Sequence, residues 1–146
     1  MTPNKVCPVV MRCQDGLAEI LAFRHPKAGF QLIKGTIEPG EAPEVAALRE
    51  LAEESGINDA AVGRELGLWP SGHEGQVWWM AVVEPAAPLP DTWSHHAPDD
   101  GGMELLFFWQ PLHVSLGPGW HPVFERAIAF VGRLRSGNES LRNPLL

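Results

Sequence analysis

Carboxylates are concentrated between Gly35 and Ile57, in the segment GTIEPGEAPEVAALRELAEESGI, which holds six glutamates and a single arginine. Glu50, Glu53 and Glu54 follow the spacing i, i+3, i+4. On a helix such residues are neighbours, with β-carbons roughly 5–6 Å apart. Three carboxylates this close repel one another unless a positive charge lies between them. Mg²⁺ and Mn²⁺ prefer carboxylate oxygens, carbonyls and water, so the pattern predicts a metal site.

The helix that would carry these carboxylates is predicted over residues 43–55. Pro43 suits a first helical turn, and Gly56 suits a C-terminal cap. Spacing at 3.6 residues per turn places an apolar face opposite the acidic face, with small residues beside the acids that would leave room for a bulky ligand. The apolar face is expected to hold Val45, Leu48 and Ala52, and the small residues are Ala46 and Ala47.

A turn-rich loop with two glycines, Gly35 and Gly40, precedes the helix. Such a loop is able to bring a backbone carbonyl to the same metal. Lys34 stands next to it and is expected to meet a phosphate. The alternative interpretation of the helix alone is a solvated face on which Arg49 pairs with Glu53 at i+4. One arginine cannot neutralise the whole group, which favours a cation.

Loop and helix together resemble the box of the Nudix hydrolase family, G-x5-E-x7-R-E-U-x-E-E-x-G-U, where U is a bulky apolar residue. The resemblance covers 23 of the 146 residues directly, and every fixed position matches. The matching residues are Gly35, Glu41, Arg49, Glu50, Leu51, Glu53, Glu54, Gly56 and Ile57.

The resemblance implies a metal site. Glu50, Glu53 and Glu54 are expected to bind catalytic divalent cations, Mg²⁺ or Mn²⁺, together with the carbonyl of Gly35. Glu50 holds the position that acts as general base in some members, while other members draw the base from a loop. The catalytic residues expected from the box are Glu50, Glu53 and Arg49.

Supporting roles follow from the same resemblance. Arg49 is expected to orient the glutamates through a salt bridge, and Glu41 to support the site directly or through water. Many members use one more acid shortly before a late strand, and Glu104 in GGMELLFFW is the candidate. A glutamate beside buried apolar residues needs a partner, which a metal would supply. The alternative for Glu104 is a strand-end residue that faces solvent.

Candidate substrate contacts lie outside the acids. Lys34, Arg24, His25 and Lys27 are expected near phosphates. Trp78 and Trp79 are consecutive on a predicted strand, so one is expected in the core and the other to stack on a base. Trp93 is expected in a lid. A further group is interpreted as part of a solvated or substrate-closing loop rather than a structural metal site: His95, His96, Asp99 and Asp100.

The sequence says less about the substrate than about the metal site. The loop KGTIEPGE looks like that of members that cleave diadenosine polyphosphates or diphosphoinositol polyphosphates, but Ile33 replaces their usual proline and the chain has no tyrosine for base stacking. The expected function is hydrolysis of a nucleoside diphosphate linked to another moiety, with dinucleotide polyphosphates and nucleoside triphosphates ahead of nucleotide sugars. The alternative is a non-catalytic Nudix-fold module that binds or senses a nucleotide.

The elements that position these residues alternate between strands and helices. Strands are predicted at 6–12, 17–25, 30–33, within 62–72, at 76–83 and at 103–112, with a hairpin turn at Asp15-Gly16. Residues 84–102 are predicted as a long loop and 121–137 as an amphipathic helix, followed by a frayed tail. This order favours an α/β (α+β) chain, a mixed β-sheet between helices as in the Nudix αβα sandwich, in a single domain over 1–146.

Composition limits the classes of partner. Hydrophobic residues make up 45% of the chain and charged residues 20%, a globular balance. A net charge of −7 argues against double-stranded nucleic acid, which needs a basic surface. No apolar stretch is long enough to span a membrane. Cys7 and Cys13 would lie roughly 20 Å apart on one strand, which argues against a disulfide between them and favours two buried thiols. We expect two free thiols, a cytoplasmic location, a small nucleotide substrate and, as in many relatives, a homodimer.

Overall fold

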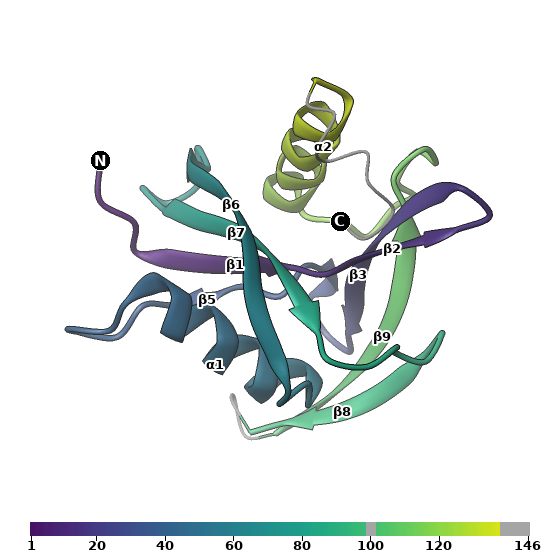
Figure 1. Ribbon diagram of the computed structural model, residues 1–146, viewed down its shortest axis with the longest axis horizontal. Coiled ribbons are helices and arrows are strands. Elements are labelled where there is room, and N and C mark those ends of the chain that lie inside the picture. Colours follow the sequence, from purple (N-terminus) through teal and green to yellow (C-terminus); the bar gives the residue numbers. More distant parts are fainter. Residues whose placement is uncertain (99–101, 138–146) are drawn as a thin grey trace.

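The computed structural model describes residues 1–98 and 102–137 and shows a sandwich of helices and sheets (Figure 1). Asp99, Asp100 and the tail after Gly137 lie outside the described residues. The elements in chain order are β1 (Lys5–Val9), β2 (Met11–Gln14), β3 (Leu17–His25), β4 (Gly29–Gln31), β5 (Gly35–Thr36), α1 (Pro43–Ser55), β6 (Ala60–Pro70), β7 (Val77–Pro85), β8 (Trp93–Ala97), β9 (Met103–Pro111) and α2 (Pro122–Gly137).

The first sheet is mixed and has the strand order β5-β1-β7-β6. β1 and β7 run parallel, while β5 pairs with β1 and β6 with β7 in antiparallel fashion. Helix α2 covers one face of this sheet and α1 the other (Figure 1). The expected mixed sheet between two helices is confirmed.

The second sheet is antiparallel, with the order β2-β3-β9-β8 and with β4 added to β3. It packs against the C-terminal half of α1 through a cluster that includes Leu51, Ile57, Phe23 and Phe107. The hairpin between β2 and β3 turns at Asp15 and Gly16 with φ of 51° and 78°. Two positive φ angles are what an Asp-Gly hairpin turn requires, so this prediction is confirmed.

Residues 6–12 do not form one strand. The chain leaves the first sheet after Val9 and enters the second at Met11, with Val10 between them. Val10 stays buried, and its carbonyl accepts the N–H of Leu21 at 2.8 Å. The bend is made by a buried valine, and apart from Pro8 two residues earlier, no glycine or turn pair marks the change of sheet.

The segment 84–102 contains strand β8, which the prediction of a loop missed. Trp93, His95 and Ala97 alternate along it with more exposed residues, and β8 pairs with β9 in antiparallel register. Two histidines and a serine in five residues hide this alternation from a hydrophobicity pattern. β6 is also longer than expected and carries irregular pairing between Val62 and Gly67.

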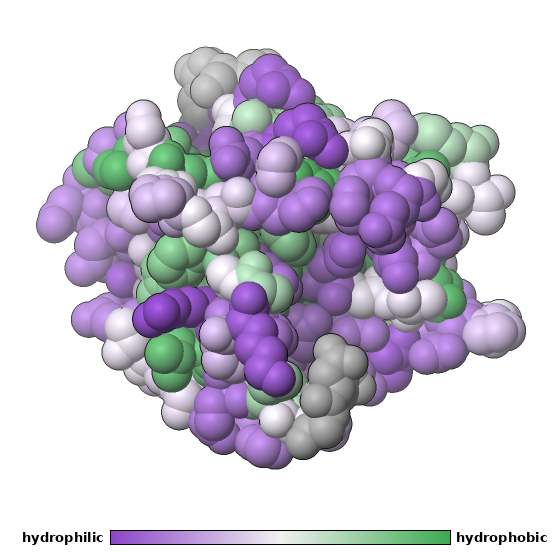
Figure 2. Space-filling view, turned by 180° about the vertical axis from the view of Figure 1, so that it is seen from behind, coloured by the Kyte–Doolittle hydropathy of each residue, from purple (hydrophilic) through white to green (hydrophobic). Residues whose placement is uncertain are grey.

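Cys7 is buried and Cys13 is half-buried, and both are free thiols as expected, although they now belong to different sheets. Within residues 1–98 and 102–137, no helix is both long and apolar enough to cross a membrane. Figure 2 shows hydrophilic residues over much of one face, with hydrophobic residues in separate small patches.

Candidate active site

The helix that carries the acidic residues has the predicted bounds. Pro43 occupies its first turn, and Gly56 ends it in the left-handed conformation, where its N–H donates to the carbonyl of Ala52 at 2.9 Å. A residue with φ of 80° at this position satisfies a terminal carbonyl that would otherwise lack a donor. The positions of Glu50, Glu53 and Glu54 therefore follow from signals at both helix ends.

The face through which α1 packs is not the expected one. Val45 is 57% exposed, whereas Ala46 and Ala47 are fully buried against Trp79 and Ala81 of β7. The two alanines do not leave room for a ligand. Their small size instead lets the helix lie close to the sheet, which brings the carboxylates of the next turn over the strand that begins at Gly35.

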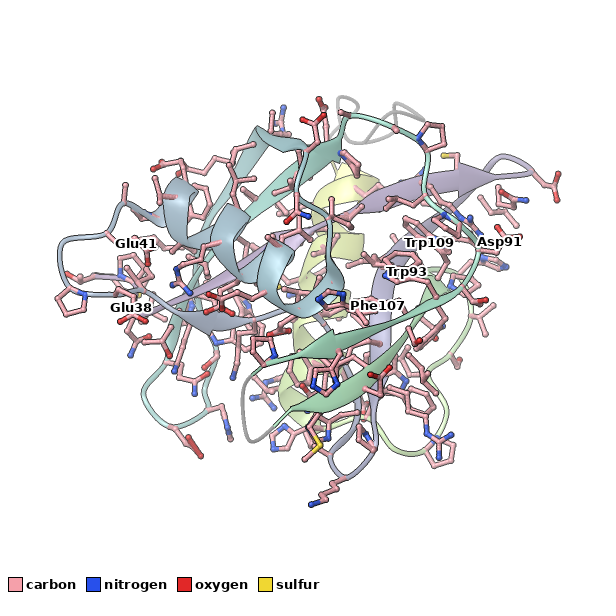
Figure 3. The ribbon with its side chains drawn as sticks, turned by 90° about the horizontal axis from the view of Figure 1, so that it is seen from below. Glu38, Glu41, Asp91, Trp93, Phe107 and Trp109 are labelled. Atoms are coloured by element: carbon pink, nitrogen blue, oxygen red, sulfur yellow. The ribbon has the colours of Figure 1, made fainter. Side chains whose placement is uncertain are left out.

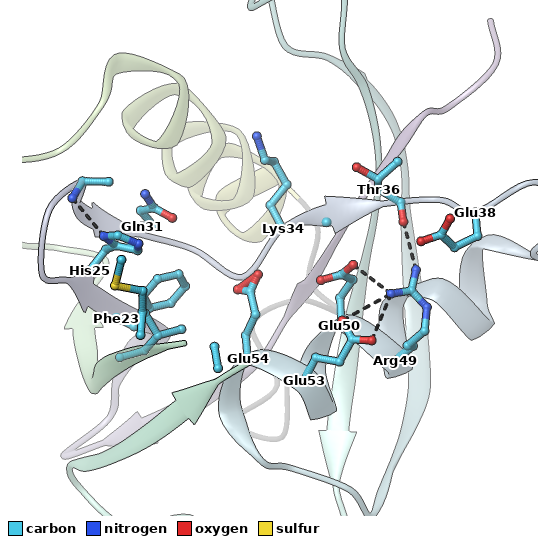
Figure 4. Close-up of a pocket in the computed structure, with 15 residues that line it drawn as sticks. Phe23, His25, Gln31, Lys34, Thr36, Glu38, Arg49, Glu50, Glu53 and Glu54 are labelled. Carbon is cyan, nitrogen blue, oxygen red and sulfur yellow. Dashed lines mark hydrogen bonds and ion pairs between the residues drawn. The ribbon is translucent and has the colours of Figure 1, made fainter. Parts of the chain in front are cut away.

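Glu50, Glu53 and Glu54 line one pocket of about 610 Å³ together with Gly35 and Lys34 (Figure 4). Glu50 is the most enclosed of the three, at 7% exposure. Its carboxylate lies against Gly35 so closely that a β-carbon on that residue would overlap it. The first glycine of the box therefore has a steric role, because it makes space for a buried acid.

Arg49 holds the loop and the helix together. Its Nε and Nη2 donate to the two carboxylate oxygens of Glu41, each at 2.8 Å, and Nη2 also donates to the carbonyl of Thr36 at 2.9 Å. Nη1 donates to Glu50 at 2.9 Å and contacts Glu53 at 3.4 Å. The predicted pair with Glu53 exists but is the longest of these contacts, and Glu41 is the main partner (Figure 3 shows its position).

These contacts shift the pKa values of Glu41 and Arg49. Hydrogen bonds from Arg49, with a further one from the N–H of Glu38, lower the pKa of the Glu41 carboxyl to about 2. Hydrogen bonding to Glu41 and then to Glu50 raises the pKa of Arg49. Glu41 is therefore ionised throughout the physiological range, and it fixes the guanidinium that in turn orients Glu50.

Lys34 lines the pocket but turns away from the acids, toward α2 (Figure 4). Its Nζ donates to Gln76 Oε1 at 3.2 Å and lies 5.3 Å from the ring centroid of Trp78. Burial, and then the charge of Lys5, lower its pKa. A partly buried cation at this position fits the predicted phosphate contact, which stays a prediction.

The donor set suits a hard divalent cation. Three carboxylates and the Gly35 carbonyl provide oxygen ligands of the kind that Mg²⁺ and Mn²⁺ prefer. In the part of the chain that the structure describes, no group of three acidic, histidine or cysteine side chains is arranged closely enough to hold a metal ion. Nη1 of Arg49 lies between Glu50 and Glu53, so loading a metal requires these carboxylates to reorient. Glu53 has the freedom to do so, since its side chain is 36% exposed.

Glu104 is not placed to join this site. Its neighbours Met103 and Leu105 line the pocket, while Glu104 itself is exposed and contacts His96 Nδ1 at 3.0 Å. His95 packs beside Gly56 at the end of the helix. Glu104 thus lies as a solvent-facing strand residue outside the pocket lining, and its role as a metal ligand stays a prediction.

Arg24 is excluded from the pocket in a similar way. Phe23 and His25 line the pocket, so the exposed Arg24 between them lies on the opposite face of β3. The structure does not bring Arg24 to the pocket lining, so its substrate contact stays a prediction, whereas His25 does reach the pocket. Gln31, the register partner of Phe23, lies there too, and no local pattern pointed to it.

The tryptophans expected near the substrate are structural. Trp78 is fully buried and Trp79 is 4% exposed, because β7 lies between the two helical layers and each ring enters a core cluster. Neither ring is accessible for base stacking, which corrects that expectation. Trp93 is not in a lid. It stacks on Phe107 with an interplanar angle of 8°, and its Nε1 donates to the carbonyl of Ser55 at 3.0 Å (Figure 3).

Comparison with known proteins shows which family and which relatives this chain is similar to. The family model of the NUDIX domain matches residues 2–123. Over 55 residues the chain is 38% identical to an NAD-capped RNA hydrolase of Schizosaccharomyces pombe, a match that covers 36% of this chain and 15% of that protein. It is 36% identical over 55 residues to Nudix hydrolase 25 of Arabidopsis thaliana, covering 38% of this chain and 31% of the relative. These matches thus cover less than a third of either curated relative.

A solved structure is similar over nearly the whole length. The Nudix hydrolase RenU of M. smegmatis aligns with a TM-score of 0.61 and 22% identity, covering 99% of this chain and 90% of that one. At this level of identity the likeness concerns the fold.

Proposed function

The chain belongs to the NUDIX domain family, and from that premise we propose that it is a divalent-metal-dependent pyrophosphohydrolase that cleaves a nucleoside diphosphate linked to another moiety. The observation that carries the proposal is the meeting of Glu50, Glu53, Glu54 and Gly35 in one pocket. An acidic cluster by itself would repel a phosphate. With metal ions bound it becomes a site for a diphosphate.

The residues that would hold Mg²⁺ or Mn²⁺ are Glu50, Glu53 and Glu54 with the carbonyl of Gly35. Ions bound there would neutralise the charge of the diphosphate oxygens and acidify a bound water. The chain's own contribution is orientation and proton transfer. Arg49 holds Glu50 at 2.9 Å, and a carboxylate of the cluster accepts the proton of the attacking water. Phosphoryl transfer depends mainly on such positioning and charge stabilisation.

The substrates to test first are dinucleotide polyphosphates and nucleoside triphosphates, followed by nucleotide sugars. The name of the fission yeast relative adds NAD-type caps, in which a diphosphate joins two nucleosides. A cytoplasmic location and a homodimer remain predictions from the sequence.

Glu53→Gln tests the proposal. Turnover of a panel of nucleoside diphosphate derivatives, with Mg²⁺ or Mn²⁺ and with the metal removed by chelation, identifies a substrate for the wild type. Loss of a carboxylate that serves as base or ligand is expected to lower kcat by about a hundredfold or more. Glu44→Gln is the matched control, since Glu44 lies exposed in the first turn of the same helix.

A Nudix-fold module that binds a nucleotide without cleaving it gives a different result. It would bind members of the panel but release no phosphate product, with or without metal. Unchanged turnover in Glu53→Gln would contradict the assigned role of the acidic cluster. The complete set of box glutamates favours the enzyme over the module.

A further inference from the structure

The pocket has a second end that the acidic cluster does not use. Phe23, His25 and Gln31 lie at this end, and Glu54 separates it from Arg49 at the other (Figure 4). Met103, whose strand partner Ala97 also lines the pocket, belongs to the same lining. The first end carries the charged groups that suit phosphates and metals. The second is built from apolar side chains with an imidazole and an amide beside them.

This end is open because α1 covers only part of the second sheet. Trp93 donates to Ser55 at the end of the helix, and His95 packs beside Gly56. Farther along the same face, beyond the helix, the strands continue with the pocket residues. Phe23 pairs in register with Gln31 on β4, and Ala97 pairs with Met103 on β9, so the floor combines four neighbouring strands.

His25 is held in one orientation by the turn that follows it. Its Nδ1 accepts the backbone N–H groups of Lys27 and Ala28, each at 3.0 Å. A ring nitrogen that accepts hydrogen bonds carries no proton, so the proton of the neutral imidazole resides on Nε2. Nε2 lies on the side of the ring away from the turn and is a fixed hydrogen-bond donor (Figure 4).

We propose that this end of the pocket binds the nucleobase of the substrate, with His25 donating from Nε2 to an acceptor atom on the edge of the base. The inference rests on the proposed function, because it assigns the group attached to the diphosphate. Met103 is half-buried and offers an apolar surface to a heteroaromatic ring, whereas Phe23, at 2% exposure, only closes the floor of this end. The Gln31 amide provides both a donor and an acceptor for its edge.

A phosphate suits this end poorly. Its floor is apolar, and removing an anion from water without a counter-charge costs free energy. Arg24 lies on the opposite face of β3, and Lys34 is directed toward Gln76. In this proposal His25 therefore donates a hydrogen bond to the neutral nucleobase. This differs from the phosphate contact expected from the sequence.

Two substitutions of His25 separate binding from turn formation. His25→Asn places an amide oxygen near the position of Nδ1, where it accepts the turn N–H groups, but it removes the Nε2 donor. His25→Gln places an amide N–H near the position of Nε2 but gives up the acceptor for the turn. His113→Asn is the control, because His113 is exposed and outside the pocket.

The kinetic test compares the best nucleoside triphosphate of the panel with ribose 5-triphosphate, which has the same phosphate chain and no base. His25→Asn is expected to raise KM for the nucleotide about five- to tenfold, the effect of losing one hydrogen bond, and to leave the base-free compound unchanged. His25→Gln is expected to keep the wild-type KM for both. An equal rise of KM for both compounds would overturn the proposal. So would a wild-type KM for the nucleotide in His25→Asn together with a raised KM in His25→Gln.

A binding measurement separates this proposal from the proposed function. The imidazole ¹⁵N resonances of His25 are followed by NMR while AMP, GMP, UMP or CMP is added without metal. A shift of the His25 resonance, which is assigned by its absence in His25→Asn and is retained in His113→Asn, supports the base subsite even if no compound is hydrolysed. Hydrolysis of nucleotides with no shift for any of the four would overturn the subsite and leave the proposed function standing. Neither hydrolysis nor a shift would overturn both.

Discussion

The carboxylate of Glu50 lies where the first atom of any side chain at position 35 would have to be. Gly35 has no positive φ, so its backbone would accept alanine, and the conflict is with the acid alone. This relationship links the loop to the helix and gives the first glycine of the box a physical reason.

Gly35→Ala is expected to displace Glu50 without unfolding the protein. Misplacing one catalytic group by about 1 Å costs on the order of a hundredfold in rate. The free energy of unfolding should change by less than about 1 kcal/mol, because the carboxylate is the movable end of its side chain. Turnover measures the loss of rate and chemical denaturation the free energy of unfolding, while EPR of bound Mn²⁺ reports the displacement of Glu50. Gly117→Ala, where a β-carbon meets nothing within 4 Å, is the control. Wild-type turnover in Gly35→Ala would contradict the steric role.

Glu41→Gln is expected to change how stability depends on pH. The pKa of Glu41 is lowered from 4.5 to about 2 in the folded protein, chiefly by hydrogen bonds from Arg49. A depressed carboxyl pKa stabilises the fold above the unfolded pKa, and this contribution is lost as the pH falls from 4.5 toward 2. The substitution should therefore lower the free energy of unfolding at pH 7 and flatten its decline toward pH 2.

Denaturant titrations across this pH range measure the effect. Glu44→Gln is the matched control, since Glu44 is exposed on the same helix. If the curves of Glu41→Gln and wild type ran parallel between pH 4.5 and 2, the bidentate contact with Arg49 would not be the source of the lowered pKa.

The sequence predicts the helix of the acidic box and the first hairpin because each carries its own local signals. Pro43 and Gly56 mark the ends of α1, and Asp15-Gly16 requires positive φ angles that few other pairs adopt. These signals depend only on neighbours in the chain. They were sufficient to place Glu50, Glu53 and Glu54 on one helix.

Side-chain direction on strands could not be predicted in the same way. Glu104 and Arg24 each lie between two residues that line the pocket, and a shift of one position reverses the face. Which face meets the pocket depends on pairing with distant strands, such as that of Phe23 with Phe107. The burial of both Trp78 and Trp79 likewise follows from helices on both faces of β7, which is a property of the whole fold.

Gly56→Ala is expected to destabilise the protein at the end of the same helix. A left-handed conformation costs a non-glycine residue about 1–2 kcal/mol, and a β-carbon there would lie 2.8 Å from His95 Nδ1. His95→Ala in the Gly56→Ala background should recover the part of the lost unfolding free energy that comes from this contact. The part that comes from the backbone conformation should remain lost. Gly132→Ala is the control: it lies within α2 with open space around it, and it should stabilise the fold by up to about 1 kcal/mol. Equal stability of Gly56→Ala and wild type in thermal and chemical denaturation would contradict the steric argument.

The two cysteines are expected to react very differently with a thiol reagent. Burial raises the pKa of the Cys7 thiol to about 12, so very little of it is the reactive thiolate at pH 8. Cys13 is only half-buried near the sheet edge at β2. Labelling of the native protein with an aromatic disulfide, followed by absorbance and mass spectrometry, should modify Cys13 alone, and Cys13→Ser should remove this reaction. Both thiols should react after unfolding in denaturant. Rapid labelling of native Cys13→Ser would show instead that solvent reaches Cys7 through opening of the core between β1 and α2.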